Sequence, residues 1–301
     1  MGVRGWVSSA VCGAGLLLAG CGGSVPQPNL LAGNWLIAGP MPTDQLQLPP
    51  VTNGFSLAMT FDVTGNEVTA VGFGNAPCQE APSSPPPILG PASVSFSTSA
   101  TGTVAADGSF SMQAPANLFV GAMSIQGKAP QTSSGEWSGN YAASVNSAFP
   151  ALCTGSYSGT IAATSFPLIN GVYVGTGSLE TIVNGVPSTA AVMFQATLKQ
   201  GGTVVDMTTG KPLASNLVLG GSIRVQGSPC FTSGVASSFP NSSVAGNLVV
   251  AVFTMDDGST LSIEGTLTDP TEARLATALA LVNGGQCDKN IYQLQELDRQ
   301  S

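Results

Sequence analysis

The chain has 301 residues, of which 43% are hydrophobic and only 8% are charged, and it contains no histidine. The absence of an imidazole excludes a Ser-His-Asp triad, a Cys-His dyad and a histidine-ligated zinc site. Eight basic against sixteen acidic residues give a net charge of −8 without a basic cluster, so an electrostatic footprint for nucleic acid is missing. The length predicts about two domains, and the positive mean hydropathy argues against a disordered chain.

The first twenty residues have the composition of an export signal. Arg4 supplies a positive charge, residues 11–18 form an apolar stretch, and Leu18-Ala19-Gly20-Cys21 ends it. This ending resembles the lipobox of bacterial lipoproteins. The resemblance implies that the Cys21 thiol receives a diacylglyceryl group, that a signal peptidase cuts before Cys21, and that the new amino terminus is N-acylated. Two or three acyl chains anchor a protein to membrane lipid firmly, whereas one chain does not.

We therefore expect a signal peptide over residues 1–20, and a lipidated cysteine with a short tether over residues 21–29. Gly22, in place of an aspartate, resembles lipoproteins sorted to the outer membrane of Gram-negative cells, on its periplasmic or surface face. The alternative is an ordinary secretory signal with an incidental Cys21, which the single charge of Arg4 favours. The apolar run is shorter than the roughly 20 residues that span a bilayer, and no later stretch reaches that length.

The sequence after the tether follows a β pattern. Apolar residues alternate with polar or small ones over residues 55–61 and again over residues 68–73, on either side of a turn. Asp107-Gly108 and Asp257-Gly258 each separate two apolar stretches, which is typical of a β-hairpin. Turn signals recur at intervals of roughly 8 to 15 residues, which favours antiparallel sandwiches or barrels over βαβ units.

A glycine-flanked aromatic residue recurs along the chain. The pattern Gly-x-aromatic-x-Gly occurs at residues 135–139, 155–159 and 171–175, and Gly33-Asn34-Trp35 has its first half. It places one large ring on the same sheet face as two bare backbone positions, which suits tightly curved strands. Gly33-Asn34-Trp35 also resembles the G-x-W element of lipocalin-type β-barrels, and the resemblance covers these three residues.

Four landmarks recur in the same order and indicate a diverged duplication. Gly33, Pro77-Cys78, Asp107-Gly108 and Cys153 have counterparts 138, 152, 150 and 134 residues later, at Gly171, Pro229-Cys230, Asp257-Gly258 and Cys287. We therefore predict an all-β protein with two tandem, diverged antiparallel β-barrel or β-sandwich domains, over residues 30–165 and 166–297. Residues 298–301 form a C-terminal tail.

Cysteine positions fit this duplication. Cys12 is removed with the signal and Cys21 carries lipid, so Cys78, Cys153, Cys230 and Cys287 remain in an oxidising compartment. The repeat favours one intradomain bridge per copy, Cys78–Cys153 and Cys230–Cys287. Crossed pairings that join the two domains, and free buried thiols, are the alternatives.

One segment near the C-terminus is a helix candidate. Asp269 suits an N-cap position and Pro270 suits the first helical position, ahead of residues 271–282. The alanine and leucine content of these residues suits a strand equally well.

A search for catalytic patterns finds none that is specific. Residues 155–159 carry Tyr157 where a nucleophile elbow needs serine, and Asp256-Asp257 is more typical of a hairpin turn than of a calcium site. A carboxylate pair for glycoside hydrolysis stays open, because such pairs come from distant positions. The available carboxylates are Asp62, Glu67, Glu136, Glu180 and Glu264. We assign no catalytic residue, no metal ligand, no ligand-binding residue and no cofactor besides the acyl groups on Cys21.

The sequence is compatible with three classes of function. The favoured class is a non-catalytic, lipid-anchored binding module of the cell envelope, with a small apolar ligand, an envelope component or another envelope protein as its partner. The second is a structural or surface-display lipoprotein without a ligand. The third is a carboxylate-dependent hydrolase, which the small number of aromatic side chains disfavours, because sugar sites use them for stacking.

Overall fold

The computed structural model describes residues 30–39, 55–78, 92–116, 120–130, 135–145, 155–183, 186–205, 210–271, 274–285 and 287–300. Every helical or extended element in these ranges is a β-strand, so the predicted all-β class is confirmed. Within the same ranges, no helix is long and apolar enough to cross a membrane. The signal peptide, Cys21 and the tether lie outside the described residues.

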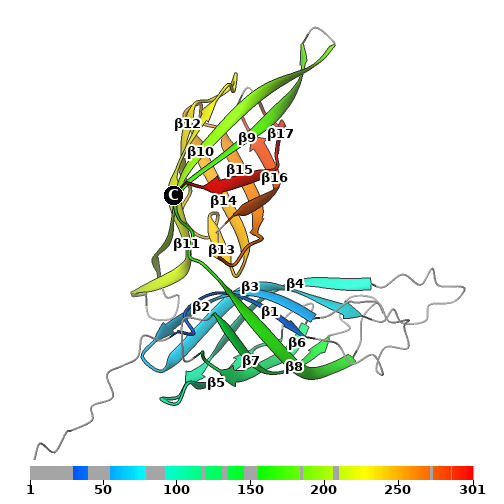
Figure 1. Ribbon diagram of the computed structural model, residues 1–301, viewed down its shortest axis with the longest axis vertical. Helices are drawn as coiled ribbons and strands as arrows, with labels where there is room; N and C mark the ends of the chain where they lie inside the picture. Colours follow the sequence, from blue (N-terminus) through cyan, green and yellow to red (C-terminus); the bar gives the residue numbers. More distant parts are fainter. Residues whose placement is uncertain are drawn as a thin grey trace, which may run out of the picture.

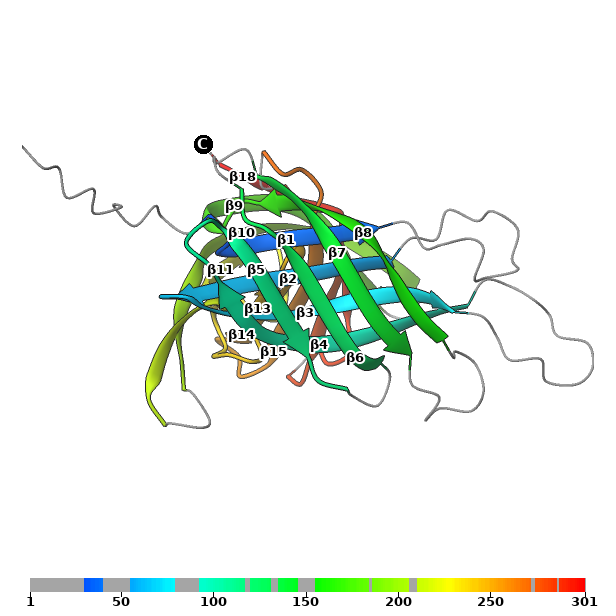
Figure 2. The ribbon, with the colours of Figure 1, turned by 90° about the horizontal axis from the view of Figure 1, so that it is seen from below.

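The first eight strands form a closed antiparallel barrel, in which β1 pairs with both β2 and β8 (Figures 1 and 2). Their bounds are β1 Gly33–Gly39, β2 Phe55–Thr64, β3 Glu67–Cys78, β4 Ala92–Val104, β5 Ser109–Ala114, β6 Val120–Lys128, β7 Glu136–Val145 and β8 Gly155–Phe166. Each strand pairs with the strand that follows it in sequence, and the pairing of β8 with β1 closes the barrel. The hairpin predicted at Asp107-Gly108 is the β4–β5 connection.

The later strands form a second antiparallel sheet, drawn above the barrel in Figure 1. Their bounds are β9 Asn170–Val183, β10 Val186–Val205, β11 Pro212–Gln226, β12 Ser233–Ala236, β13 Ser243–Ala245, β14 Leu248–Met255, β15 Thr260–Leu267, β16 Leu275–Asn283, β17 Ile291–Leu294 and β18 Glu296–Arg299. Strand β9 pairs with β10 on one side and with β17 and β18 on the other, so the pairings return to their start. The short strands β12 and β13 both lie between β11 and β14, and the short strands β17 and β18 both lie between β16 and β9. Each of these two sets therefore occupies a single position around the ring.

Each sheet encloses its own hydrophobic core. In the barrel, four aromatic rings meet at the end where β1 begins and β8 finishes, with centroids 5.0–6.4 Å apart: Trp35, Phe61, Phe110 and Trp137. In the second sheet, Phe194 and Phe231 pack against Tyr292 with centroids 5.5 and 5.9 Å away. Of the predicted alternating residues, Leu57, Met59 and Phe61 are inward, as are Val68 and Ala70, whereas Phe73 lies on the outer face with 47% of its surface exposed.

The glycine-flanked aromatic pattern lies in curved strands, as predicted. Trp35, Trp137 and Tyr173 are all buried inside the sheets. A Cβ atom at Gly139 would lie 2.0 Å from the backbone oxygen of Gln126, and one at Gly175 would lie 2.2 Å from that of Glu296. Only glycine permits such a close approach of the neighbouring strand, so this pattern marks sites of tight curvature.

The helix candidate over residues 271–282 was wrong, because residues 275–283 form strand β16. Asp269 does cap a turn, since its carboxylate accepts a hydrogen bond from the Thr271 amide at 2.6 Å. Leu275, Ala280 and Val282 are buried in the second core, while β15 pairs along the whole strand. Tertiary pairing therefore overrides the local helix-start signal.

Candidate functional site

The interior of the barrel differs between its two ends. The four packed aromatic rings fill the end at which β1 begins. Toward the opposite end, the small inward residues Gly74, Ala114 and Gly159 pair with large buried ones, namely Leu57, Met123 and Tyr141. The aromatic rings therefore close one end of the barrel, whereas small and large side chains alternate around the interior toward the other end.

Two buried polar atoms lie in these interiors without a hydrogen-bond partner among the described residues, namely Trp137 Nε1 and the Tyr173 hydroxyl. Trp35 differs, because its Nε1 donates to the Leu31 carbonyl oxygen at 2.7 Å. Burial raises the pKa of Tyr173, an effect that the positive charge of Arg299 opposes. A buried N–H group normally pairs with protein, water or ligand, so Trp137 offers a free donor inside the barrel.

A buried polar cluster joins the barrel to the second sheet. The side-chain amides of Asn34 on β1 and Gln200 on β10 exchange two hydrogen bonds, of 2.9 and 2.7 Å. The Thr60 hydroxyl lies 2.9 Å from Asn34 Oδ1 and accepts a hydrogen bond from the Gly246 amide at 3.0 Å. Asn34, Thr60 and Gln200 are all at most 5% exposed. We call these three residues the amide clamp; because its members bond one another, it holds the two parts of the chain together.

The carboxylates considered for hydrolysis are dispersed. Asp62 accepts hydrogen bonds from the Ser215 hydroxyl at 2.6 Å and the Asn216 amide at 2.7 Å, beside the amide clamp. Glu67, Glu136 and Glu264 are exposed, and the side chain of Glu180 lies outside the described residues. The part of the chain that is described contains no group of three or more metal-ligating side chains. Asp62 thus has a structural role that bridges β2 and β11.

The acids at the two hairpin tips form turns. Asp257 accepts hydrogen bonds from the Ser259 amide at 2.9 Å and from its hydroxyl at 2.6 Å. Asp256 instead accepts from the hydroxyl and the amide of Thr232, and the hydroxyl is the larger reason why the pKa of this carboxyl is lowered. Hydrogen bonds from the hydroxyl and the amide of Ser109 lower the pKa of Asp107. The contacts of Asp107 and Asp257, each with the residue two positions on, are those of Asx turns, whereas Asp256 joins its hairpin tip to Thr232, 24 residues earlier.

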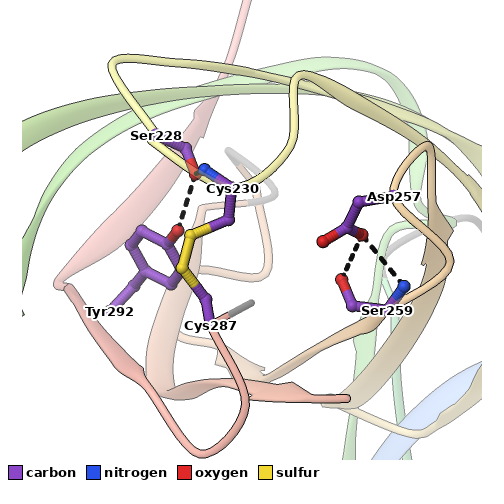
Figure 3. Close-up of a disulfide and its surroundings, with 6 residues drawn as sticks. All are labelled: Ser228, Cys230, Asp257, Ser259, Cys287 and Tyr292. Atoms are coloured by element: carbon purple, nitrogen blue, oxygen red, sulfur yellow. Dashed lines mark hydrogen bonds between the residues drawn. A yellow bond between two sulfur atoms is a disulfide. The ribbon is translucent and has the colours of Figure 1, made fainter. Parts of the chain in front are cut away.

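The predicted bridge between Cys230 and Cys287 is confirmed, with Cα atoms 6.0 Å apart and a sequence separation of 57 (Figure 3). Beside it, the hydroxyls of Ser228 and Tyr292 share a hydrogen bond at 2.8 Å. Burial raises the pKa of Tyr292, the Ser228 hydrogen bond opposes the rise, and the charge of Asp257 adds to it. The bridge ties the segment after β11 to the turn before β17. Cys153 lies outside the described residues, as does the side chain of Cys78.

An open depression of about 530 Å³ lies on the outer side of the second sheet, where β9 meets β17. Five side chains that line it are Thr176, Ser178, Ile291, Gln293 and Gln295. Sequence reasoning did not find these residues. In the sequence they share only a predominance of uncharged polar side chains. The two strands that carry them are far apart in sequence, since Ser178 and its pairing partner Gln293 are separated by 115 positions.

No protein-family model matches this chain, and no curated protein matches it. Among solved structures, the chain is similar to a crystal structure of kievitone hydratase from Nectria haematococca, with 10% sequence identity and a TM-score of 0.23. The match covers 92% of this chain and 91% of that chain. A TM-score at this level supports no argument about fold or activity.

Proposed function

We propose that the protein is a non-catalytic, lipid-anchored binding module of the cell envelope, and that its first barrel holds a small apolar ligand. The observation that carries this proposal is the difference between the two ends of the barrel. Large rings close one end, small residues alternate with larger ones toward the other, and the buried Trp137 N–H has no hydrogen-bond partner among the described residues. An apolar interior with a few polar groups is typical of small-molecule sites.

We further propose that the chain is a diverged duplication of one barrel unit, with a boundary between β8 and β9. Pro77-Cys78 ends the third strand of the first set, and Pro229-Cys230 follows β11, the third strand of the second set. Cys153 and Cys287 both precede the last strand position of their sets. Strands β12 and β13 share the fourth position of the second ring, so Asp257-Gly258 joins the fifth and sixth positions, whereas Asp107-Gly108 joins the fourth and fifth strands of the barrel. These two turns are therefore not counterparts.

This topology also supports the second predicted bridge. Cys78 is the last residue of β3, and Cys153 precedes Gly155, the first residue of β8, by two positions. In the antiparallel barrel, the end of β3 and the start of β8 lie at the same end. We therefore retain Cys78–Cys153 as the bridge of the first unit.

Ligand binding in the barrel predicts a fluorescence change. After removal of the leader, the chain keeps Trp35 and Trp137, and both lie in the aromatic cluster. We expect the neutral fluorophore N-phenyl-1-naphthylamine to bind the full-length protein and to quench tryptophan emission saturably. Ala114→Phe should reduce its affinity about tenfold or more, since a phenylalanine ring at this inward position takes up interior space. Native mass spectrometry of gently purified protein should show a copurified apolar molecule.

Gln113→Phe is the matched control, because residue 113 precedes Ala114 on β5 but is exposed on the outer face. It should bind the fluorophore like the unmodified protein. If the fluorophore and copurified mass are both absent, the binding function is wrong and the structural or surface-display role takes its place. The packed aromatic core of the second sheet is the observation that favours that alternative.

The lipid anchor gives a separate prediction. The proposed lipobox makes Cys21 the acceptor of the diacylglyceryl group. We expect the full chain, expressed in a Gram-negative host, to incorporate labelled palmitate and to sediment with the outer membrane. Cys21→Ser should abolish incorporation completely, whereas Cys12→Ser, in the same leader, should leave it intact. Palmitate on the Cys21→Ser protein, or none on the unmodified chain, would contradict the proposed anchor.

A further inference from the structure

The depression beside β17 is built around an irregularity of the sheet. Gly177 is opposite Leu294, but Val174 is opposite Asp298, so two residues of β9 face three residues of the partner chain segment. The extra residue is in the segment 295–297, and Gln295 belongs to neither β17 nor β18. This is the arrangement of a β-bulge, a feature that re-aims side chains and is frequent next to binding sites.

Two glycines of β9 let the strands come close at this point. A Cβ atom at Gly175 would lie 2.2 Å from the Glu296 backbone oxygen, and one at Gly177 would lie 2.7 Å from that of Gln293. The Gln295 carbonyl oxygen accepts a hydrogen bond from the Thr277 amide at 3.0 Å, which holds the bulge to β16. The depression is thus formed by rigid backbone rather than by a loop.

The side chains that face the depression are uncharged and polar. Thr176 and Ser178 contribute hydroxyls, and Gln295 contributes an amide, so the wall both donates and accepts hydrogen bonds. Among the described residues, the Gln295 amide and the Ser178 hydroxyl make no intramolecular hydrogen bond, and no charged side chain lines the depression. Ile291, with 51% of its surface exposed, supplies an apolar shoulder.

We propose that this depression binds a neutral saccharide, a second activity that is independent of the barrel interior. A sugar ring carries hydroxyls that donate and accept, together with an apolar C–H face, and here the exposed Ile291 side chain, in place of an aromatic ring, offers the apolar surface for that face. A charged ligand would meet no opposite charge on the lining. A peptide cannot add here as a new strand, because β9 is already paired with β10 on one side and with β17 and β18 on the other.

The test uses the full-length protein in a detergent without sugar groups, such as lauryldimethylamine oxide. Chitotetraose and maltotetraose are titrated separately, and binding is followed by saturation-transfer NMR. We expect saturable binding of at least one of them with a dissociation constant of about 1 mM or below. A preference for chitotetraose assigns the site to N-acetylated sugars, whereas equal binding assigns it to neutral saccharides in general.

Two variants locate the site. Gln295→Ala removes the bulge amide, and Ser178→Leu fills the depression from β9 with an aliphatic side chain that removes a hydroxyl and adds no stacking surface, so each should weaken binding at least tenfold. Gln226→Ala is the matched control, because this exposed glutamine on β11 does not line the depression. An intact Cys230–Cys287 bridge, measured by mass, verifies that each variant is folded. Absence of saturable binding of both sugars at 10 mM, or unchanged binding by the folded Gln295→Ala and Ser178→Leu proteins, would overturn the proposal.

Discussion

Replacing Gln200 by alanine is expected to lower the free energy of unfolding by about 4 kcal/mol, because several buried polar groups then lose their partners at about 1–3 kcal/mol each. The Gln200 amide donates to Asn34 Oδ1 and to the Asn216 carbonyl oxygen, both at 2.7 Å. It also accepts from Asn34 Nδ2 and from the Ile169 amide, both at 2.9 Å. At 5% exposure, water cannot replace all four of these bonds without a change in packing.

The measurement is urea unfolding followed by two probes, tryptophan emission for the barrel and far-ultraviolet circular dichroism for both sheets. Gln226→Ala, at an exposed site on β11, should change the free energy by less than about 0.5 kcal/mol. A double-mutant cycle with Asn34→Ala isolates the interaction of the two amides. A loss below about 1 kcal/mol for Gln200→Ala would show that the amide clamp does not stabilise the joined structure.

Removing the bridge between Cys230 and Cys287 is the second change with a large expected effect. A closed loop of 57 residues restricts the unfolded chain by about 4 kcal/mol in the chain-entropy description. The double variant Cys230→Ala with Cys287→Ala should therefore lose about that much stability. Cys287 is 5% exposed and packs in the second core, so its replacement also removes buried contacts. Urea unfolding of the variant and of the unmodified oxidised protein gives the difference.

Peptide mapping of the oxidised protein tests the same chemistry directly. Digestion without reduction should release one linked peptide pair that contains Cys230 and Cys287, and a second pair that contains Cys78 and Cys153. The variant without Cys230 and Cys287 should keep the second pair, which serves as its internal control. A peptide that joins Cys78 to Cys230 or Cys287 would contradict one bridge per unit.

Several features of the fold follow from short-range patterns. Alternation over residues 55–61 predicts a strand with one buried face, and Leu57, Met59 and Phe61 are fully buried. The Asp-Gly turns predict hairpins, because glycine accepts the backbone angles that these turns need. The segment 271–282 shows the limit of this reasoning: Asp269 and Pro270 resemble a helix start, yet pairing with β15 makes a strand.

The amide clamp and the depression illustrate what local patterns omit. Asn34 and Gln200 are 166 residues apart, and nothing near either residue indicates that an amide partner will be buried against it. The depression depends on a one-residue mismatch between β9 and the β17–β18 segment, which is a property of register between distant strands.

The sequence by itself determined the β class, the hairpin turns and the buried aromatic residues of the glycine-flanked pattern, and it favoured the pairing of Cys230 with Cys287. All of these depend on periodicity, on the backbone preferences of glycine and aspartate, or on the order of landmarks along the chain. The tertiary structure alone decided the closure of the barrel, the contact between the two sheets through Asn34, Thr60 and Gln200, and the bulge at Gln295. These arise where residues far apart in sequence meet, and their energies depend on burial and register that no single segment contains.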